Sequence, residues 1–372
     1  MSQIGSNEKI TTQQAAVFVA NYILGVGILT LPRAAAEKVK TPDIWLTVIL
    51  GGLIAMVAGI IVAKLSQQYP GKTIYEYSQH IVGKWLGIVL NASIIIYFIV
   101  TSGNMVRAMS EVMNLYLLEG TPRWVVIMSF LWVGMYIIVG GVSAIARFFE
   151  IVFPLTVLTI LFLALLSFKI FDVNNLRPVL GQGIGPVLNG VKTTGLSFSG
   201  FEILLVLQAY MSTPKKAVRA VVIGILIPIL FYVVTVVMVV GALSISGVVS
   251  QTWPTITLFR SFEYPGILFE RYESLLLVIW VIQIFTTYAI THYAAALGIA
   301  RMVNKDIRPM LYALIPVIYL ASMSPRNIND LFSMGERIGD VAMIMFGILP
   351  AILLIIVKWR RRLARNEQEQ WK

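Results

Sequence analysis

Ionisable side chains are scarce within the long apolar stretches of this sequence, so the few that occur there are the first candidates for chemistry. Glu202 follows the segment "TGLSFSG", Arg33 follows a proline, and Arg107 and Glu111 lie four residues apart. A carboxylate can accept hydrogen bonds from an ammonium group or take up a proton, and arginine pairs readily with carboxylates. Glu202 is therefore predicted to carry a proton, to bind a ligand ammonium group, or to pair with Arg33 or Arg107.

The three other charged residues each have two interpretations. Residues four apart share a helix face, so Arg107 and Glu111 can pair locally. Alternatively, they form a gate near the outer mouth of a pathway. Arg33 can belong to the same gate, or its long side chain can reach from an apolar environment to water as an anchor. With Glu202, these residues are the possible gating or proton sites.

Two segments rich in small residues interrupt otherwise apolar sequence. They are "LGVG", with Gly25 and Gly27, and "TGLSFSGFE" at 194–202. Glycine costs about 1 kcal/mol relative to alanine inside a helix, so both segments predict helix breaks. The N-terminal end of one half-helix attracts an anion, and the carbonyls of the other attract a cation. The pair suits a zwitterion such as an amino acid; alternatively, the glycines only let helices approach closely.

The elements that carry these residues are predicted to be membrane-spanning helices. The chain has 372 residues, of which 58% are hydrophobic and 13% are charged, whereas soluble proteins have about 25% charged residues. Its mean hydropathy is +0.83. A spanning helix needs roughly 20 apolar residues, and charge-free runs such as Ala220–Phe259 exceed that length. The sequence therefore predicts an all-α polytopic membrane protein.

We expect ten transmembrane helices and two amphipathic segments, 73–82 and 255–262, that lie along the membrane interface. The third and eighth spans are long and are expected to tilt or to project from the hydrocarbon. The predicted spans cover residues 11–37, 43–66, 85–118, 123–142, 147–170, 188–211, 215–243, 271–302, 308–324 and 336–358.

The layout of the spans predicts a single membrane domain made of two repeats. Repeat one covers about 11–170 and repeat two about 188–358. Each begins with a broken span, spans 1 and 6, and an odd number of spans per repeat makes the second repeat inverted. Paired broken segments in inverted repeats indicate a transporter-type binding site.

The distribution of basic residues predicts the orientation. Ten spans place both termini on one side, where seventeen Lys and Arg residues fall, against eleven on the other side. The positive-inside rule then makes both termini cytoplasmic. Much of the net charge of +11 lies in "KWRRRLAR" (358–365), at the start of the basic tail 359–372. Such a cluster is predicted to bind anionic lipid and not nucleic acid.

The segment "TTQQAAVFVANYILGVGILTLPR" (11–33), the Gly/Ser break in span 6 and the ten-span layout resemble the spore germination permeases. These are the B subunits of nutrient germinant receptors, within the amino acid–polyamine–organocation superfamily. The resemblance implies a LeuT-like 5+5 inverted repeat and recognition of an amino acid. It also implies a location in the spore inner membrane, with an A-type membrane subunit and a C-type lipoprotein as partners.

In that superfamily the ligand lies between spans 1, 3, 6 and 8. The resemblance therefore implies a site built from backbone at the two breaks, with Phe198 or Phe201 covering the ligand side chain. Polar groups on spans 3 and 8 complete it, although each hydroxyl can instead bond a carbonyl of its own helix. The candidate ligand-binding residues are Gly25, Val26, Gly27, Tyr97, Thr101, Gly195, Leu196, Ser197, Phe198, Ser199, Gly200, Thr287, Tyr288 and Thr291.

Three functions share this site: a receptor subunit, a proton- or sodium-coupled amino-acid transporter, and a ligand-gated pore. Apolar Val26, Leu196 and Phe198 favour a small or branched aliphatic amino acid. Lys169 is the only lysine of span 5 and lies at its outer end, so no buried lysine is expected to replace a cation. A sodium site would need Thr286 or Thr287 to face span 1.

No enzymatic function, cofactor or metal site is expected. The sequence has no cysteine and only two histidines, which excludes thiolate nucleophiles and cysteine-based metal sites. It also has no Gly-rich phosphate-binding loop.

Overall fold

The computed structural model describes residues 8–261 and 272–370, apart from the side chains of residues 26, 163, 196, 272, 273, 275 and 364–370. Within these ranges the regular elements are helices, and one isolated bridge joins Ile10 to Met211. The α-helices are α1 (Thr12–Val39), α2 (Ile44–Ser66), α3 (Ile74–Val82), α4 (Lys84–Tyr116), α5 (Arg123–Ile138), α6 (Gly141–Ser167), α7 (Gly185–Ser197), α8 (Leu204–Leu207), α9 (Ala217–Ser250), α10 (Pro254–Arg260), α11 (Tyr272–Val303), α12 (Ile307–Met323), α13 (Ile328–Ala342) and α14 (Leu349–Gln370).

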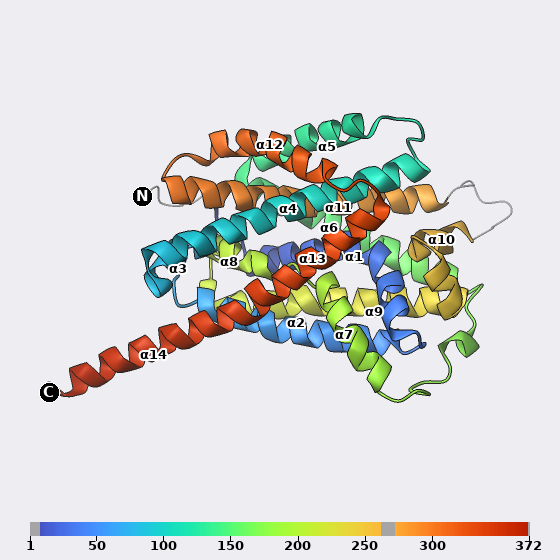
Figure 1. Cartoon of the computed structure of the whole chain (residues 1–372), viewed down its shortest axis with the longest axis horizontal. Helices are drawn as coiled ribbons and strands as arrows, with labels where there is room; N and C mark the ends of the chain where they lie inside the picture. The colour runs from blue at the N-terminus through green and yellow to red at the C-terminus, as the bar shows by residue number, and fades with distance from the viewer. Residues whose placement is uncertain (1–7, 262–271, 371–372) are drawn as a thin grey trace.

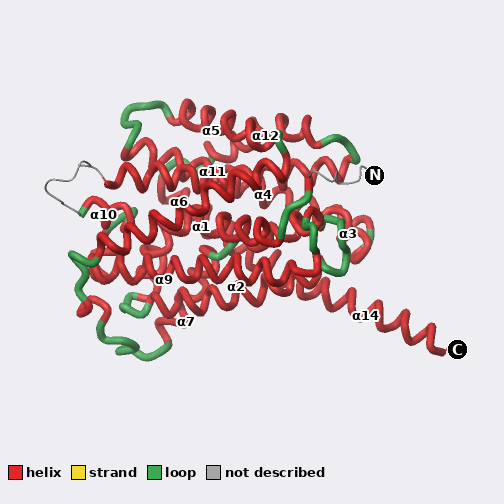
Figure 2. The backbone as a smooth tube through the Cα atoms, turned by 180° about the vertical axis from the view of Figure 1, so that it is seen from behind, coloured by secondary structure: helices red, strands yellow, loops and turns green. Residues whose placement is uncertain are grey.

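Short helical turns complete the chain: η2 (Val173–Leu176), η3 (Phe201–Ile203), η4 (Gln208–Tyr210), η5 (Pro214–Lys216) and the π-helix η6 (Met343–Ile348). Figure 1 shows the long helices running side by side along one direction, with the start of α1 and the end of α14 at the same end of the bundle. In Figure 2, α14 projects beyond the rest of the molecule.

The described helices confirm the predicted polytopic membrane fold. Six are long and apolar enough to cross a membrane, and the bent helix α1 makes a seventh. Three shorter apolar helices, Arg123–Ile138, Phe201–Tyr210 and Ile307–Met323, complete the ten predicted spans. The two segments expected to lie along the interface are helical, as α3 and α10, although Phe262, the predicted end of the second, lies outside the described residues.

The first span is bent at the predicted glycines. It begins with a capping box, in which the Thr11 hydroxyl accepts from the Gln14 amide at 3.1 Å and the Gln14 side chain accepts from the Thr11 amide at 2.9 Å. This reciprocal pair satisfies two N–H groups at the helix start, which explains the "TTQQ" motif. The segments Thr12–Gly25 and Gly27–Val39 then meet at an angle of 53°.

The sixth span is broken more completely. Helix α7 ends at Ser197, residues 198–200 form a turn, and η3, α8 and η4 continue the span to Tyr210. Gly200 has φ +143°, a conformation that glycine adopts without steric cost. The prediction that spans 1 and 6 are the broken pair is therefore confirmed.

The seventh and tenth spans differ most from their predicted bounds. Helix α9 continues beyond the predicted end at residue 243, through a non-helical residue, Ser244 (φ 59°, ψ 168°), to Ser250. The last span is predicted at 336–358 but is part of a run from α13 through η6 to α14. The sequence after 358 is rich in Arg, Leu, Glu and Gln, which are strong helix formers, so the helix continues past the apolar part.

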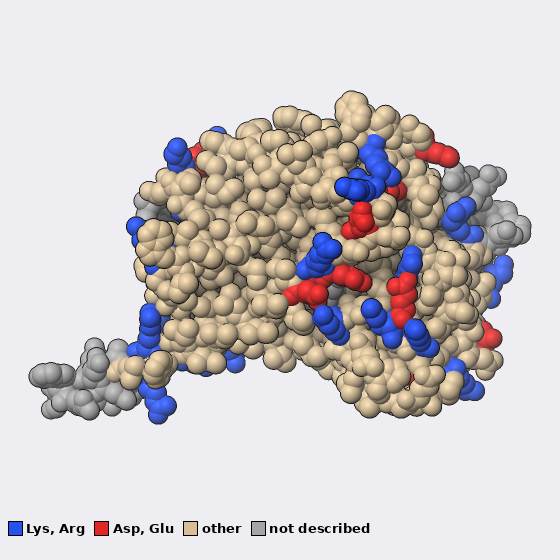
Figure 3. Space-filling model, viewed as in Figure 1, with Lys and Arg blue, Asp and Glu red and all other residues tan. Residues whose placement is uncertain are grey.

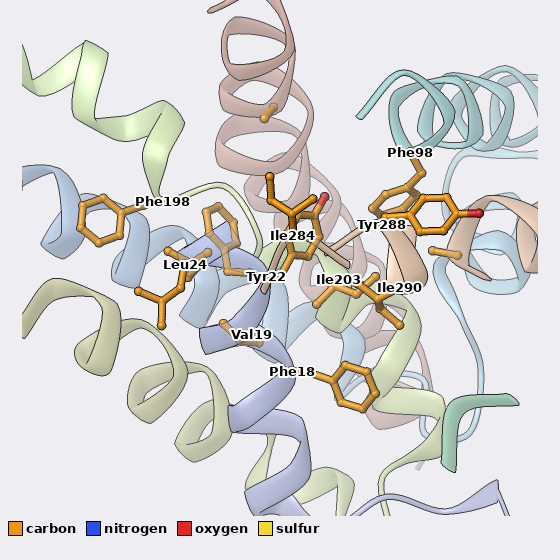
Figure 4. Close-up of a cluster of buried hydrophobic side chains, with 14 of the residues drawn as sticks. Phe18, Val19, Tyr22, Leu24, Phe98, Phe198, Ile203, Ile284, Tyr288 and Ile290 are labelled. Carbon is orange, nitrogen blue, oxygen red and sulfur yellow. The ribbon is translucent and has the colours of Figure 1, made fainter. Parts of the chain in front are cut away.

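Apolar side chains from distant helices meet in the centre of the bundle. Figure 4 shows Phe18, Val19, Tyr22 and Leu24 of α1 gathered with Phe98 of α4, with Ile284, Tyr288 and Ile290 of α11, and with Phe198 and Ile203 around the break of span 6. All of these side chains are buried. The two broken spans thus lie against α4 and α11, the helices predicted to complete the site.

Candidate functional site

The breaks of spans 1 and 6 touch each other. A Cβ atom added to Gly200 would lie 2.8 Å from Ile23 Cγ1 and 3.0 Å from the Ile23 backbone nitrogen. Both distances are shorter than a normal carbon contact allows. Glycine is therefore needed at position 200 for two reasons: the backbone has a positive φ, and α1 leaves no room for a side chain.

Glu202 places a carboxylate beside this junction. The residue is fully buried, and its Oε1 accepts a hydrogen bond of 2.7 Å from the Tyr97 hydroxyl of α4. Its Oε2 accepts a hydrogen bond of 2.6 Å from the Gly200 backbone N–H. Hydrogen bonds to an ionised acceptor are stronger than those between neutral groups. The predicted pairing of Glu202 with Arg33 or Arg107 is wrong for the described residues, because Arg33 pairs with Glu37 and Arg107 pairs with Glu111.

Side chains from three other helices bond the carbonyl groups around the bend of α1. They share two properties: all are uncharged, and all donate a hydrogen bond to an α1 carbonyl. The pairs are Gln283 to Asn21 (2.7 Å), Thr287 to Tyr22 (3.4 Å), Tyr232 to Ile23, Trp280 to Gly25 (3.0 Å) and Thr255 to Ile28 (2.8 Å).

A cavity of about 800 Å³ opens beside the two breaks. Its lining includes Tyr22, Tyr97, Trp253 before α10 and Phe332 of α13. Its outer part is charged, because α1, α7 and α13 contribute Arg33, Glu37, Lys38, Lys192, Glu336 and Asp340. Figure 3 shows acidic and basic side chains gathered around a hollow on this face. Ligand pockets typically have volumes of about 300–1,000 Å³.

The predicted ligand-binding residues fall into two groups around this cavity. Residues that line it are Gly27, Tyr97, Thr101, Gly195, Ser197 and Ser199. Gly25, Phe198 and Gly200 lie behind its wall, where they pack against Thr287, Tyr232 and Ile23 respectively. The side chains of Val26 and Leu196 lie outside the described residues, so the apolar character predicted for the pocket stays a prediction there.

The three candidates on α11 point in different directions. The Thr287 hydroxyl faces α1. The Thr291 hydroxyl lies 2.7 Å from the Ser102 hydroxyl of α4 and also bonds carbonyls of its own helix. The Tyr288 hydroxyl donates to Leu131 O of α5 at 3.3 Å and lies 3.0 Å from His292 Nδ1. Thr287 and Thr291 thus fasten α11 to the helices around the cavity, whereas Tyr288 belongs to the contact with α5.

The charged candidates form local pairs. Arg107 Nη2 lies 2.9 Å from Glu111 Oε1, and Arg123 of α5 approaches the same oxygen at 3.3 Å. Arg33 bonds Glu37 one turn along α1 at 2.8 Å, and its guanidinium lies 5.8 Å from the centre of the Phe332 ring. Arg33 lines the cavity, whereas Arg107 and Glu111 do not.

Sequence reasoning missed Tyr22, Trp280 and Gln283. The Tyr22 side chain is buried and lines the cavity. The other two could have been found, because residues 280, 283, 287 and 291 follow helical spacing and put Trp280 and Gln283 on the face of Thr287 and Thr291.

The chain matches known proteins over nearly its whole length. The profile of a family described as "Spore germination protein", the spore permeases, matches residues 9–331. The chain is 53% identical to "Spore germination protein YndE" of Bacillus subtilis, over 95% of this chain and 98% of that protein. It is 39% identical to "Spore germination protein A2" of the same organism, over 98% of this chain and 99% of that protein.

The chain belongs to the spore germination permease family. The solved structure of MhsT in complex with L-phenylalanine shares the fold of this permease, with a TM-score of 0.65 over 93% of this chain and 97% of that one. Sequence identity in that comparison is 12%, so the likeness concerns the fold alone. It confirms the LeuT-like arrangement predicted for the permease. In the described residues, no group of three or more His, Cys, Asp or Glu side chains could hold a metal ion.

Proposed function

We propose that this permease is the B subunit of a nutrient germinant receptor and recognises a small L-amino acid at the membrane midplane. The observation that carries the proposal is the meeting of two helix breaks at a buried carboxylate, beside a cavity of about 800 Å³. Ligand binding favours one of two conformations by its differential affinity, and partner subunits respond to that conformation.

Each part of a zwitterion has a partner in this site. The ligand ammonium group pairs with Glu202, whose carboxylate already accepts from Tyr97 and Gly200. The ligand carboxylate lies at the start of the second half of α1, toward Gly27, where the helix dipole favours an anion. Thr101 and Tyr22 provide hydroxyls on the cavity wall.

The assignment of partners and place follows from the family. We infer an A-type membrane subunit and a C-type lipoprotein as partners in the spore inner membrane, with both termini cytoplasmic. The two inverted repeats cover about 11–170 and 188–358. On the cytoplasmic side, Arg361 of α14 bonds the side chain of Gln68, and its Nη2 donates to Gln68 O at 3.1 Å. The exposed Trp359 suits the membrane–water interface, and the exposed Arg360 and Arg362 suit contact with anionic lipid.

A second candidate function is proton-coupled transport of the same amino acid. It is favoured by Glu202, because a buried carboxylate inside a membrane protein can carry a proton. Both functions use one site, so the fold does not separate them.

Uptake and binding of labelled aliphatic amino acids by the purified protein in proteoliposomes test the proposal. We expect saturable binding of a ligand such as L-valine without accumulation, with or without proton and sodium gradients. Accumulation driven by a gradient would make the protein a transporter. The loss of saturable binding for every amino acid tested would overturn both functions.

A further inference from the structure

At the bend of α1, carbonyl oxygens of the helix accept hydrogen bonds from side chains of other helices. Where a helix bends, carbonyl groups lose their partners in the next turn and need donors or a cation instead. Around residues 21–28 the donors are five uncharged side chains of α9, α10 and α11.

Gln283 of α11 brings a side-chain amide to two oxygens of one residue of α1. Its Nε2 donates to Asn21 O at 2.7 Å and lies 3.1 Å from Asn21 Oδ1. The Thr156 hydroxyl of α6 approaches Gln283 Oε1 at 2.6 Å. Asn21, Thr156 and Gln283 are all at least 97% buried. The three residues thus join α1, α6 and α11 at one point.

The network fixes the direction of the amide group. The Asn21 carbonyl can only accept, so the Gln283 NH₂ group faces α1 and its oxygen faces the Thr156 hydroxyl of α6. Asn21 is oriented in the same way, because its Nδ2 donates to Phe149 O at 3.2 Å, which leaves Oδ1 for Gln283. Two oxygens of Asn21 therefore converge on two N–H donors of one neutral amide.

The same oxygens would suit a small hard cation. Carbonyl and hydroxyl oxygens are the ligands that such ions prefer, and carbonyls of broken helices coordinate sodium in transporters. We propose that the Gln283 amide is a built-in neutral substitute for a cation, and that it holds the bend of α1 in its ligand-binding shape without sodium. This inference concerns the site of the proposed function and assigns Gln283 as a positioning residue.

The consequence is a binding site whose affinity does not respond to sodium. In a sodium-coupled protein, ion and ligand each raise the affinity for the other, because coupling is reciprocal. Here the donor is covalently part of α11, so it is present whether or not sodium is available. This property suits a receptor that responds to nutrient concentration alone.

Equilibrium binding of labelled L-valine to the purified full-length protein in proteoliposomes tests the role of Gln283. Assays in sodium chloride and in choline chloride should give the same affinity for the unmodified protein. Gln283→Ala frees the Asn21 oxygens and makes room for an ion, so we expect affinity about tenfold weaker in choline. Sodium should recover at least about threefold of that loss, because the ion then bonds the freed oxygens.

The controls separate this role from a general effect on folding. Gln208→Ala removes another buried glutamine, whose side chain makes no hydrogen bond to α1 within the described residues, and it should not introduce sodium dependence. If Gln283→Ala does not fold, Gln283→Asn replaces it, because the shorter amide cannot reach both Thr156 and Asn21. Sodium-dependent binding by the unmodified protein, or a Gln283 variant that ignores sodium, would overturn the inference. Complete absence of valine binding would instead overturn the proposed function.

Discussion

Tyr97 and Glu202, 105 positions apart in the chain, are joined by a hydrogen bond of 2.7 Å in the centre of the bundle. Tyr97 belongs to α4 and Glu202 to the short helix that follows the break of span 6. The bond therefore connects a continuous helix to the broken one, at the place where the proposed ligand ammonium group binds. A substitution of either residue should lower the affinity for the ligand more than it lowers the stability of the fold.

Glu202→Gln should weaken L-valine binding by about 100-fold, because a hydrogen bond from an ammonium group to a carboxylate is stronger than one to a neutral amide. Tyr97→Phe should weaken it by about tenfold, since it removes one donor and keeps the ring. Tyr136→Phe is the matched control, because this tyrosine is 89% exposed. Equal affinity in Glu202→Gln and the unmodified protein would exclude Glu202 as the ammonium partner.

Gly200→Ala should destabilise the fold itself. The new Cβ atom would lie 2.8 Å from Ile23 Cγ1 in a backbone conformation with φ +143°, and such strain costs about 1–3 kcal/mol. We expect a lower thermal midpoint in detergent and a lower yield of folded protein. Gly185→Ala is the control, since its Cβ would meet no atom within 4 Å. Equal midpoints for the two variants would show that the turn adapts without cost.

Gly25→Ala distinguishes a binding role for the glycine from a packing role. A Cβ atom at Gly25 would lie 2.5 Å from Thr287 Oγ1, so the single substitution should push α1 away from α11 and weaken valine binding about tenfold, the worth of roughly one hydrogen bond. The double variant Gly25→Ala with Thr287→Ala removes the collision. If packing alone matters, the double variant should bind valine better than Gly25→Ala. If the affinity of both matches the unmodified protein, span 1 is not the binding break.

The positions of the spans could be predicted because long charge-free runs have few alternatives in a membrane. The bend of α1 and the turn at 198–200 could be predicted for a similar reason, since glycine clusters are costly in a helix without a structural need. Both predictions depend on local sequence. Local backbone preference and tertiary structure therefore agree at the bend of α1 and at the turn 198–200.

The partners of the bend could not be predicted from the same information. Gln283 reaches Asn21 only because of the rotation and height of α11 relative to α1, and these depend on packing between segments more than 250 residues apart. The kink at Ser244 and the π-helix η6 were missed as well. Local signals were present for both. Ser244 lies in the Gly/Ser-rich segment "GALSISG" (241–247), and Pro350 follows η6 and removes the N–H that would bond the Phe346 carbonyl.

The π-helix η6 positions Phe346 against the central hydrogen bond. The Phe346 ring is buried and lies 4.8 Å from the Tyr97 ring in an edge-to-face arrangement. π-helical turns occur frequently at functional sites, and this one connects α13, at the cavity wall, to the basic helix α14. Phe346 is therefore a contact through which the Tyr97–Glu202 pair can affect the last span.

Phe346→Leu should weaken valine binding by about three- to tenfold, because an aromatic pair contributes about 0.5–1.5 kcal/mol and its loss lets the Tyr97 hydroxyl move away from Glu202. Phe168→Leu, at a ring that is 63% exposed, is the control. In a Tyr97→Phe background the hydroxyl is already absent, so Phe346→Leu should then have little further effect on affinity. A double-mutant cycle of valine affinities measures this coupling. Strictly additive effects would show that Phe346 acts on binding independently of Tyr97.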